Sequence, residues 1–511
     1  FARKHGKPCQ TCHVSEPKLN AFGELFRANG YQLPGTIEDT PPWSMRRIVM
    51  AVMLHEMAVD RIIESNMRAI PPPGLPSGGK YHVRSFRDAG GHIWFGGTFG
   101  NKLSFMTSLG IEQEFSVKSG RFSSESHAHW DFAFFQYNNI FNSRTGVANI
   151  KFGSFELELP YSELRRLSSA LAPYEVYRIK GVKGSFRLDA PQVGVSFNGL
   201  KMFGVNSLRY EVAVVNGTNG NFDTNVEVDY YTRLAYSRLF DGVVKQIRIG
   251  GLYYMGAQNL RDLSGNPYPT AAILDYWNDE FGINVHINQD LSKFYRWGVD
   301  VSVDVELLGY PINLYSQYLV GHDDDIDMTN LNMPYFGAGA GESDDHVSVA
   351  KTTSGDGEWL VRPFDYNGGF VGADFVILPT KLYLITRYDW VTLVNQWGDP
   401  VDGKEVRANQ SASWEYNEVD LDFGDPMPRG MTGNLNADPN KGQNAYNRMT
   451  FGVRYHLTQP LTLIYEFASQ DNLFGFPEPG SNMYNPDWVA GMGRTVNVDS
   501  HWHMFMVMFA F

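Results

Sequence analysis

Hydrophobic and polar residues alternate with a period of two over several stretches of the chain. In the clearest stretch, from Tyr295 to Leu307, every odd position is apolar or aromatic and every even position is polar, charged or glycine. The same alternation appears at 226–237 and 451–467. On a β-strand these two sets of side chains face opposite sides of the sheet. The pattern therefore predicts strands with one apolar and one polar face.

A soluble β-sandwich also alternates, but three features favour a membrane barrel. The segments have about the length of a tilted membrane strand, roughly 9–11 residues. Charged residues crowd the polar face and aromatic residues mark the strand ends, as in outer-membrane barrels. No long apolar run of the kind that forms a transmembrane helix is present.

The C-terminus supports the same fold. Residues 501–511 end on Phe511, and Phe505, Val507 and Phe509 share one face of the expected strand. This stretch resembles the closing strand of bacterial outer-membrane barrels, so we expect the chain to lie in the bacterial outer membrane.

The spacing of turns and loops gives a strand count. Short turns are expected near 100–102, 138–146, 200–205, 239–244, 308–311, 378–381 and 457–460. Long loops are expected near 113–128, 157–192, 257–293, 322–368, 393–448 and 471–500, with a shorter link near 216–225. In such barrels the short turns are periplasmic and the long loops extracellular. Alternating the two sets gives fifteen strands from residue 92 onward, and closure adds one before it. We therefore predict an all-β fold, a sixteen-stranded antiparallel transmembrane barrel, with residues 282–288 assigned to a loop or lumen insertion.

The chain divides into three parts. Residues 1–36 form a short N-terminal segment, residues 37–80 a linker that includes a candidate first strand, and residues 81–511 the barrel. Within the linker, Ile48, Val52 and Val59 are spaced more like a helix, and periodicity alone does not decide between helix and strand.

Composition narrows the function classes. The 511 residues carry a net charge of −13, which argues against a nucleic-acid partner. Aromatic residues make up 14% and there are 51 glycines, a mixture typical of many strands with glycine turns and aromatic girdles.

The strongest chemical signal is Cys9-Gln10-Thr11-Cys12-His13. A Cys-x-x-Cys-His run is the attachment signal for a c-type haem: the two thiols bind the haem vinyl groups and the histidine is the proximal iron ligand. A disulfide or a thioredoxin-like pair needs no histidine at the next position, and a thioredoxin motif would lie in a βαβ pattern. Because these are the only two cysteines, we predict one covalently bound haem c. Such attachment takes place outside the cytoplasm, so we also expect that a secretory signal peptide has been removed.

A short helix is expected after this motif. Ser15 is a candidate N-cap, Leu19, Phe22 and Phe26 form an apolar stripe, and Asn29-Gly30 provide a stop. The stripe could cover one face of the haem.

The N-terminus resembles that of the fused outer-membrane monohaem cytochrome c–porins, whose best-known members oxidise Fe(II). The resemblance covers about the first 45 residues and rests on Phe-Ala-Arg-Lys-His-Gly, the Cys-x-x-Cys-His run, and Pro17-x-Leu19-x-x-Phe22-Gly23-x-x-Phe26-x-x-Asn29-Gly30-Tyr31. It implies a monohaem segment followed by an outer-membrane barrel. We expect the segment to plug the lumen, because so short a chain has too little core to fold well alone.

The distal haem ligand would be a thioether or an imidazole. Met45 ranks first, because it follows a Pro-Pro-x-Ser feature that resembles the family, and His55 ranks second. Met50, Met53 and Met57 are further candidates, although a Met-rich apolar run is more often plain packing.

Other polar groups are weaker candidates. The acidic stretches around 322–327 and 342–346 could attract Fe(II) or another cation, but a solvated acidic loop is the simpler interpretation. His127, His129, His501 and His503 could support a further cofactor, although each alone is more often a polar wall residue.

These observations predict electron transfer across the outer membrane through the single haem. The resemblance implies that the chain accepts electrons from extracellular Fe(II) and passes them to periplasmic cytochromes, either as an Fe(II)-oxidising oxidoreductase or as an electron-transfer protein. The expected partners are a periplasmic c-type cytochrome, extracellular Fe(II) or a multihaem cytochrome, and outer-membrane lipid. The alternatives are an outward electron conduit, a solute porin with a structural or sensory haem, and a haem enzyme such as a peroxidase.

Overall fold

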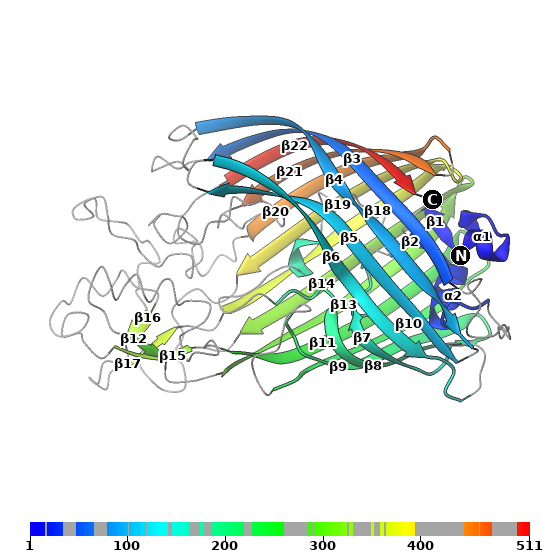
Figure 1. Ribbon diagram of the computed structural model, residues 1–511, viewed down its shortest axis with the longest axis horizontal. Helices are drawn as coiled ribbons and strands as arrows, with labels where there is room; N and C mark the ends of the chain where they lie inside the picture. Colours follow the sequence, from blue (N-terminus) through cyan, green and yellow to red (C-terminus); the bar gives the residue numbers. More distant parts are fainter. Residues whose placement is uncertain are drawn as a thin grey trace.

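The chain forms a closed barrel of antiparallel strands (Figure 1). The computed structural model describes residues 1–15, 18–33, 48–65, 79–100, 102–118, 121–141, 146–162, 174–177, 186–218, 227–259, 285–287, 291–323, 326–330, 349–351, 358–361, 364–393, 444–458, 460–472 and 498–510. The sixteen strands pair in chain order, and the last, β22 (Val498–Ala510), closes the barrel against the first, β3 (Ile48–Ser65). The predicted strand number is confirmed.

The remaining strands lie between these two. They are β4 Gly79–Phe99, β5 Leu103–Lys118, β6 Arg121–Tyr137, β7 Asn149–Phe155, β8 Gln192–Phe203, β9 Asn206–Val215, β10 Asp229–Leu239, β11 Val244–Asn259, β13 Leu291–Leu307, β14 Tyr310–Asp323, β18 Phe364–Leu378, β19 Leu382–Leu393, β20 Asn444–His456 and β21 Leu461–Asn472.

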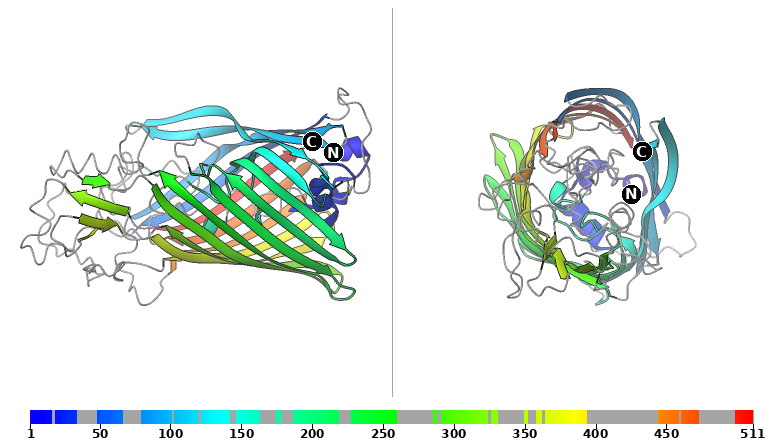
Figure 2. Two further views of the ribbon diagram at one scale, coloured as in Figure 1. Left: turned by 90° about the horizontal axis from the view of Figure 1, so that it is seen from below. Right: turned by 90° about the vertical axis from the view of Figure 1, so that its left-hand side faces the viewer.

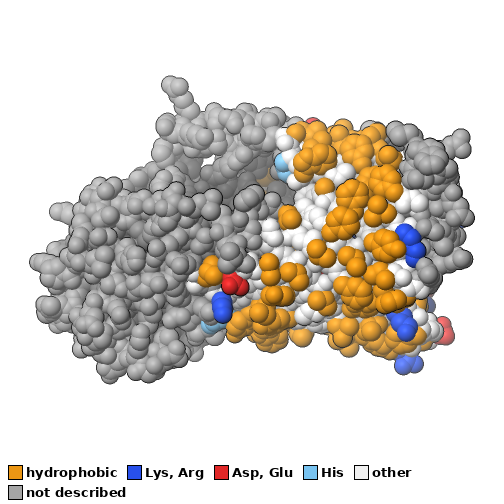
Figure 3. Space-filling view, turned by 60° about the horizontal axis from the view of Figure 1, so that its bottom comes forward, with side chains coloured by type: hydrophobic (Ala, Val, Ile, Leu, Met, Phe, Trp, Pro, Cys, Tyr) orange, Lys and Arg blue, Asp and Glu red, His pale blue; other side chains and the backbone are white. Residues whose placement is uncertain are grey.

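The outer face of the barrel is apolar and the inner face is polar, as the alternation predicts. On β10 and β13 the outward Leu234 and Val299 are 56% and 51% exposed, whereas the inward Arg233 and Asp300 are almost completely buried. Hydrophobic side chains form a broad belt over the outer surface (Figure 3). A closed barrel leaves no unpaired strand edge in lipid, and this barrel with its apolar belt is that of a bacterial outer-membrane protein.

The segment at 48–65 is a strand, not a helix. Over β3 the inward side chains include His55 and Val59, both buried, while Met50 and Leu54 are 60% and 50% exposed on the outside. Pairing with β22 and β4 decides the conformation, which local spacing alone left open.

The N-terminal region contains short elements only. These are α1 (Ala2–His5), the 3-10 turn η1 (Cys9–Thr11), the paired strands β1 (His13–Ser15) and β2 (Lys18–Leu19), and α2 (Ala21–Ala28). No helix in the described part of the chain has both the length and the apolar character to cross a membrane.

Four expected loops differ from the structure. The stretch 113–128 mostly continues β5 and β6 as a long hairpin. Within 257–293 and 322–368, short strands pair as a separate sheet, β12 (Val285–Ile287), β15 (Ile326–Asn330), β17 (Glu358–Val361) and β16 (Val349–Lys351). The described parts of 157–192 pack against the inner wall instead of extending outward: the hydroxyl of Tyr161 donates to the carbonyl of Val301 at 2.9 Å.

This inward loop fills part of the lumen with an apolar core. Its side chains Leu157, Leu159, Tyr161, Tyr174 and Tyr177 are at most 5% exposed. They cluster with inward residues of β9–β11, β13, β14, β18 and β19. The 3-10 turn η4 (Glu175–Tyr177) belongs to the same loop and contacts β18 and β19. The barrel is therefore filled on this side by its own chain.

Substituting Leu234 by arginine tests the lipid-facing assignment. A charge near the middle of β10 should destabilise the barrel by about 2–4 kcal/mol, because arginine is costly at the bilayer midplane. Urea unfolding in lipid vesicles measures this. Leu308→Arg is the control, since Leu308 is 90% exposed in the turn between β13 and β14 and should lose less than about 1 kcal/mol. Equal losses in both variants would contradict a lipid belt centred on Leu234.

Candidate haem-attachment site

The Cys-x-x-Cys-His loop is a compact turn. After Pro8, the amide of Thr11 donates to the carbonyl of Pro8 and the amide of Cys12 to that of Cys9, each at 3.0 Å. Cys9 and Cys12 are free thiols and partly exposed. Partial burial raises the pKa of the Cys12 thiol, so this thiol remains protonated at neutral pH. Both thiols are thus accessible for covalent attachment.

Asn20 fixes the backbone of this loop. Its side-chain amide donates to the carbonyls of Gln10 and Thr11, each at 3.1 Å, and its backbone amide donates to the carbonyl of Cys12 at 2.9 Å. Its side-chain oxygen accepts from the amide of Gly23 at 3.0 Å, which caps α2. One residue therefore holds three consecutive carbonyls of the loop and begins the following helix.

The predicted cap was wrong. Ser15 does not cap the helix, because two further residues of strand β2 intervene before it begins. The hydroxyl of Ser15 instead contacts Nε2 of His456 on the barrel wall at 2.6 Å. The predicted end of the helix is confirmed, with Asn29 at the C-cap and Gly30 in the left-handed region.

Gly23 allows α2 to approach the loop. A Cβ built on Gly23 would overlap the carbonyl oxygen of Cys12, so a larger residue would push the helix away from the loop. On another face of α2, Phe26 is 5% exposed and packs edge-on against Phe1, His5 and Tyr31, with ring centroids 5.1–6.2 Å apart. This aromatic cluster is the segment's own small core.

The N-terminal segment (described residues 1–15 and 18–33) lies at the end of the barrel where the short turns are. Figure 2 shows its helices inside the ring of strands when the barrel is viewed along its length. The hydroxyl of Tyr383 donates to the carbonyl of Val14 at 2.6 Å. Nζ of Lys18 lies 2.6 Å from the carboxylate of Asp374 and 2.9 Å from the side-chain oxygen of Asn313. Short turns are periplasmic in such barrels, so the Cys-x-x-Cys-His loop belongs to the periplasmic mouth.

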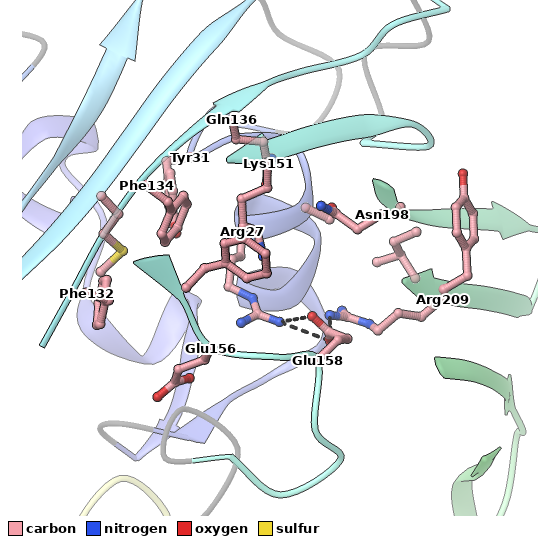
Figure 4. Close-up of a pocket in the computed structure, with 16 residues that line it drawn as sticks. Arg27, Tyr31, Phe132, Phe134, Gln136, Lys151, Glu156, Glu158, Asn198 and Arg209 are labelled. Atoms are coloured by element: carbon pink, nitrogen blue, oxygen red, sulfur yellow. Dashed lines mark hydrogen bonds and ion pairs between the residues drawn. The ribbon is translucent and has the colours of Figure 1, made fainter. Parts of the chain in front are cut away.

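Four charged residues join α2 to the wall and to the lumen loop. Arg27 of α2 contacts Glu158 of the loop at 2.8 Å, and Arg209 of β9 contacts both Glu158 at 2.7 Å and Glu24 of α2 at 2.8 Å. Figure 4 shows Arg27 and Arg209 reaching Glu158 from opposite sides. The side chains are 10–19% exposed. The positive charges of the two arginines and the negative charges of the two glutamates cancel, which permits the burial of all four side chains.

The electrostatics of this cluster favour the ionised glutamates. Burial alone would raise the pKa values of Glu24 and Glu158, but the nearby Arg209 and Arg27 guanidinium groups outweigh it and hold both values below their ordinary range. The same contacts raise the pKa of Arg27, although its burial opposes this. Both glutamates and Arg27 are therefore charged at neutral pH.

The structure brings together only part of the predicted site. Cys9 and Cys12 lie on one turn, and His13 follows directly as the first residue of β1, where it pairs with Leu19 of β2. His55 lies on the inner face of β3, where its ring is 5.5 Å from that of His92. Met45 lies outside the described residues. Met45 and His55 therefore stay predictions for the distal ligand.

Of the four further histidine candidates, His129, His501 and His503 have ordinary polar partners, and the side chain of His127 lies outside the described part of the structure. His129 and His92 contact the two carboxylate oxygens of Asp131 at 3.1 and 2.9 Å, and His501 and His503 contact Ser469 and Tyr465. Among the described residues, no group of three or more His, Cys, Asp or Glu side chains is arranged to hold a metal ion. The acidic residues at 342–346 lie outside the described residues.

The residues present fit a c-type haem. The loop supplies two free, partly exposed thiols at the required spacing with an imidazole directly after them. Its backbone is held by Asn20, and Gly23 leaves room for the turn. Cys9 and Cys12 would form the thioether bonds, and His13 would be the proximal ligand.

Comparison with known proteins finds distant structural likenesses only. No family model matches the sequence, and no curated protein matches it. Among solved structures it is similar to the outer membrane channel DcaP of Acinetobacter baumannii, with 12% identity, a TM-score of 0.42, and 91% of this chain and 97% of that chain covered. It is also similar to the anion-selective porin from Comamonas acidovorans, with 9% identity, a TM-score of 0.43, and 91% and 99% covered. The likeness to Pseudomonas putida OprB has 9% identity, a TM-score of 0.43, and 91% and 94% covered. Likenesses this distant carry no argument, and the fold assignment rests on the strand pairing.

Changing Asn20 separates its two roles. Asn20→Ala removes the helix cap, worth about 0.5–2 kcal/mol, together with both bonds to the loop, whereas Asn20→Asp keeps the acceptor and loses the donors. Hydrogen exchange of the full-length protein should therefore increase at Gly23 and in residues 9–13 for Asn20→Ala, but only in residues 9–13 for Asn20→Asp. The same pattern in both variants would contradict the role of the side-chain amide.

Docking of the N-terminal segment should weaken in acid. The pKa values of Glu24 and Glu158 are lowered in the folded state. The free energy that these two carboxylates contribute to docking is therefore complete above the ordinary glutamate pKa of about 4.3. It is lost as the pH falls through the lower pKa values of the folded state. Hydrogen exchange of residues 18–33, corrected for its intrinsic rate, should be constant from about pH 7 to 5 and increase below about pH 4.

Glu158→Gln should produce faster exchange already at neutral pH, because it leaves Arg27 and Arg209 sharing one carboxylate. The control is Glu306→Gln, whose side chain forms an exposed pair with Lys245 at the barrel rim and should have no effect on residues 18–33. An unchanged exchange rate in Glu158→Gln would exclude the ion-pair cluster as the anchor.

Proposed function

We propose that this protein transfers electrons across the outer membrane through one c-type haem held by Cys9, Cys12 and His13. The observation that carries the proposal is the position of the Cys-x-x-Cys-His loop in the barrel. The loop belongs to a segment that is fixed to the inner wall at the periplasmic mouth through Ser15, Lys18 and Glu24. A redox centre at this position faces the compartment of the periplasmic electron carriers.

The bound haem would supply a one-electron iron couple. The two thiols would tether the haem and His13 would be the proximal iron ligand. Asn20 fixes the backbone of the loop that carries these residues. Met45 or His55 is the proposed distal ligand. The lumen loop around Tyr161 and Tyr174 fills the barrel behind the segment and excludes water from that side, which favours a higher reduction potential.

One haem cannot bridge a hydrocarbon core about 30 Å thick. The proposed function therefore requires a periplasmic c-type cytochrome on one side and an extracellular partner on the other. By resemblance to the cytochrome–porins the extracellular donor is Fe(II), which would make the protein an Fe(II)-oxidising oxidoreductase. A multihaem cytochrome as the outer partner, with electrons flowing in the other direction, uses the same site.

A solute porin with a structural or sensory haem is the second candidate. A closed sixteen-stranded barrel with charged groups such as Arg233, Asp300 and Arg387 on its inner wall fits this function directly. The barrel alone supports it better than electron transfer, since nothing in the strands requires a haem. The two candidates differ in whether the haem exchanges electrons and whether the lumen conducts.

Two measurements on the full-length protein decide between them. We expect the as-purified haem to be reduced by external Fe(II) over a pH series and the protein to conduct poorly in a planar bilayer. Cys9→Ser/Cys12→Ser should lose the covalent haem and the Fe(II) response, whereas the control His503→Ala, on the outer face of β22, should keep both. Free conduction together with a haem that Fe(II) does not reduce would overturn electron transfer in favour of the porin. A five-coordinate spectrum would instead favour a peroxidase-like enzyme.

A further inference from the structure

A cavity lies beside α2, on a different side of the helix from Gly23, which contacts the haem-attachment loop. It has a volume of about 70 Å³ and lies between α2 and strands β8–β11. Glu24 and Leu25 of α2 line one side, and Ser207, Arg209, Ser237 and Arg248 line the other. On the same measure a single water needs about 10–15 Å³. The cavity therefore has room for about five waters, or for one small anion with several oxygens.

The cavity opens at the periplasmic mouth. Met202, Val205 and Leu239 line it next to the short turns. These three side chains are 41–50% exposed, whereas Ala235, deeper in the lining, is 5% exposed. Solvent and small solutes can therefore enter from the periplasmic side.

Three arginines line this cavity, and two of them are neutralised by direct contacts. Arg209 contacts Glu24 and Glu158, and Arg233 makes a two-point contact with Asp300 at 2.8 and 3.1 Å. In the described part of the chain, Arg248 has no acceptor at hydrogen-bond distance and no carboxylate at ion-pair distance. Its charge acts on Glu24 only through space. Arg248 is therefore the one uncompensated charge in the lining.

Arg248 is an inward residue on a rigid strand. It pairs in register with Ser237 of β10 and Ser302 of β13, both of which are buried on the inner face. The hydroxyls of Ser207 and Ser237 lie 2.6 Å apart beside it, and the side-chain amide of Gln246 lines the same cavity. A guanidinium group with neutral hydroxyl and amide donors nearby is a favourable set for binding carboxylate or phosphate oxygens.

We propose that this cavity binds a small oxyanion, a phosphate or a carboxylate, through Arg248. The guanidinium would donate to two oxygens of the anion. Gln246 would donate to another, and so would whichever hydroxyl of the Ser207–Ser237 pair does not donate to its neighbour. The anion would compensate the charge that the protein leaves unpaired. Because residues of α2 line the cavity, binding of the anion would stabilise the N-terminal segment in its position against the barrel wall. This proposal does not depend on the haem.

Thermal unfolding of the full-length protein in detergent tests this site with inorganic phosphate as the probe. A ligand that binds only the folded state raises the unfolding midpoint, so phosphate should raise it relative to chloride at matched ionic strength. Arg248→Gln should weaken phosphate binding at least about tenfold, as expected when a charge-assisted contact is lost, and Arg248→Lys should recover part of it. The control is Arg238→Gln, which removes a cation at the same end of the barrel from the outer face of β10 and should respond like the wild type.

Filling the cavity provides a test that keeps every charge. Ala235→Leu should abolish the phosphate effect by taking up the space next to Arg248, even if Arg248→Gln fails to fold. Acetate in place of phosphate distinguishes the two anion types: a shift with acetate alone would identify the site as a carboxylate site. No shift in the wild type with either anion, or an equal shift in the wild type, Arg248→Gln and Ala235→Leu, would overturn the proposal.

Discussion

Backbone hydrogen bonding in lipid is the constraint on which the rest of this structure depends. An unpaired amide or carbonyl costs several kcal/mol in the hydrocarbon region, so the sixteen strands must close, and β22 pairs with β3 along its length. Closure gives every strand one face toward lipid and one toward the lumen. The outer face becomes an apolar belt, while the inner face holds groups such as Arg233 and Asp300 that have to be paired there. The chain's own loop and N-terminal segment then occupy the space that the wall encloses.

The N-terminal segment gains from the barrel the core that it lacks. Its only apolar cluster of its own is the group of Phe1, His5, Phe26 and Tyr31, and a unit of this size buries too little surface to be stable alone. The wall contributes partners on several strands: His456 for Ser15, Asp374 for Lys18, and Arg209 for Glu24. Because these contacts come from widely separated strands, they fix both the position and the orientation of the segment. A loosely tethered segment would leave the orientation of the Cys-x-x-Cys-His loop undetermined.

The alternation of apolar and polar residues was enough to predict the barrel and its lipid-facing side, and the spacing of turns and loops was enough to predict the strand number, since both are local patterns. Neither pattern predicted the inward loop. Leu157, Leu159 and Tyr161 pack against inward side chains of strands as far along the chain as β19. No local sequence pattern predicts a contact between such distant segments. The sequence predicts a loop at 113–128 because polar residues such as Gln113 and Ser123 are followed there by further polar residues and not by apolar ones. At the haem-attachment site the motif identified Cys9, Cys12 and His13. Ser15 was predicted as the N-cap and Asn20 was missed, although asparagine is one of the preferred N-cap residues and Asn20 stands directly before the helix Ala21–Ala28. The contact of Arg27 with Glu158 spans 131 residues and has no sequence signal.

Helix α2 links the parts of the molecule that matter most for function. Gly23 brings it against the carbonyl of Cys12, Arg27 ties it to the lumen loop, and Glu24 and Leu25 face the cavity beside Arg248. A displacement of α2 would therefore disturb the attachment loop, the ion-pair cluster and the cavity together, because the helix has only eight residues. Buried ion pairs lose much of their energy when one partner moves away, so the cluster resists such a displacement. In the proposed electron-transfer protein, this resistance keeps the redox centre at a constant position relative to a periplasmic partner. A solute porin needs only an unobstructed lumen, and the balanced charges of Glu24, Arg27, Glu158 and Arg209 would then serve no purpose beyond holding an obstruction in place.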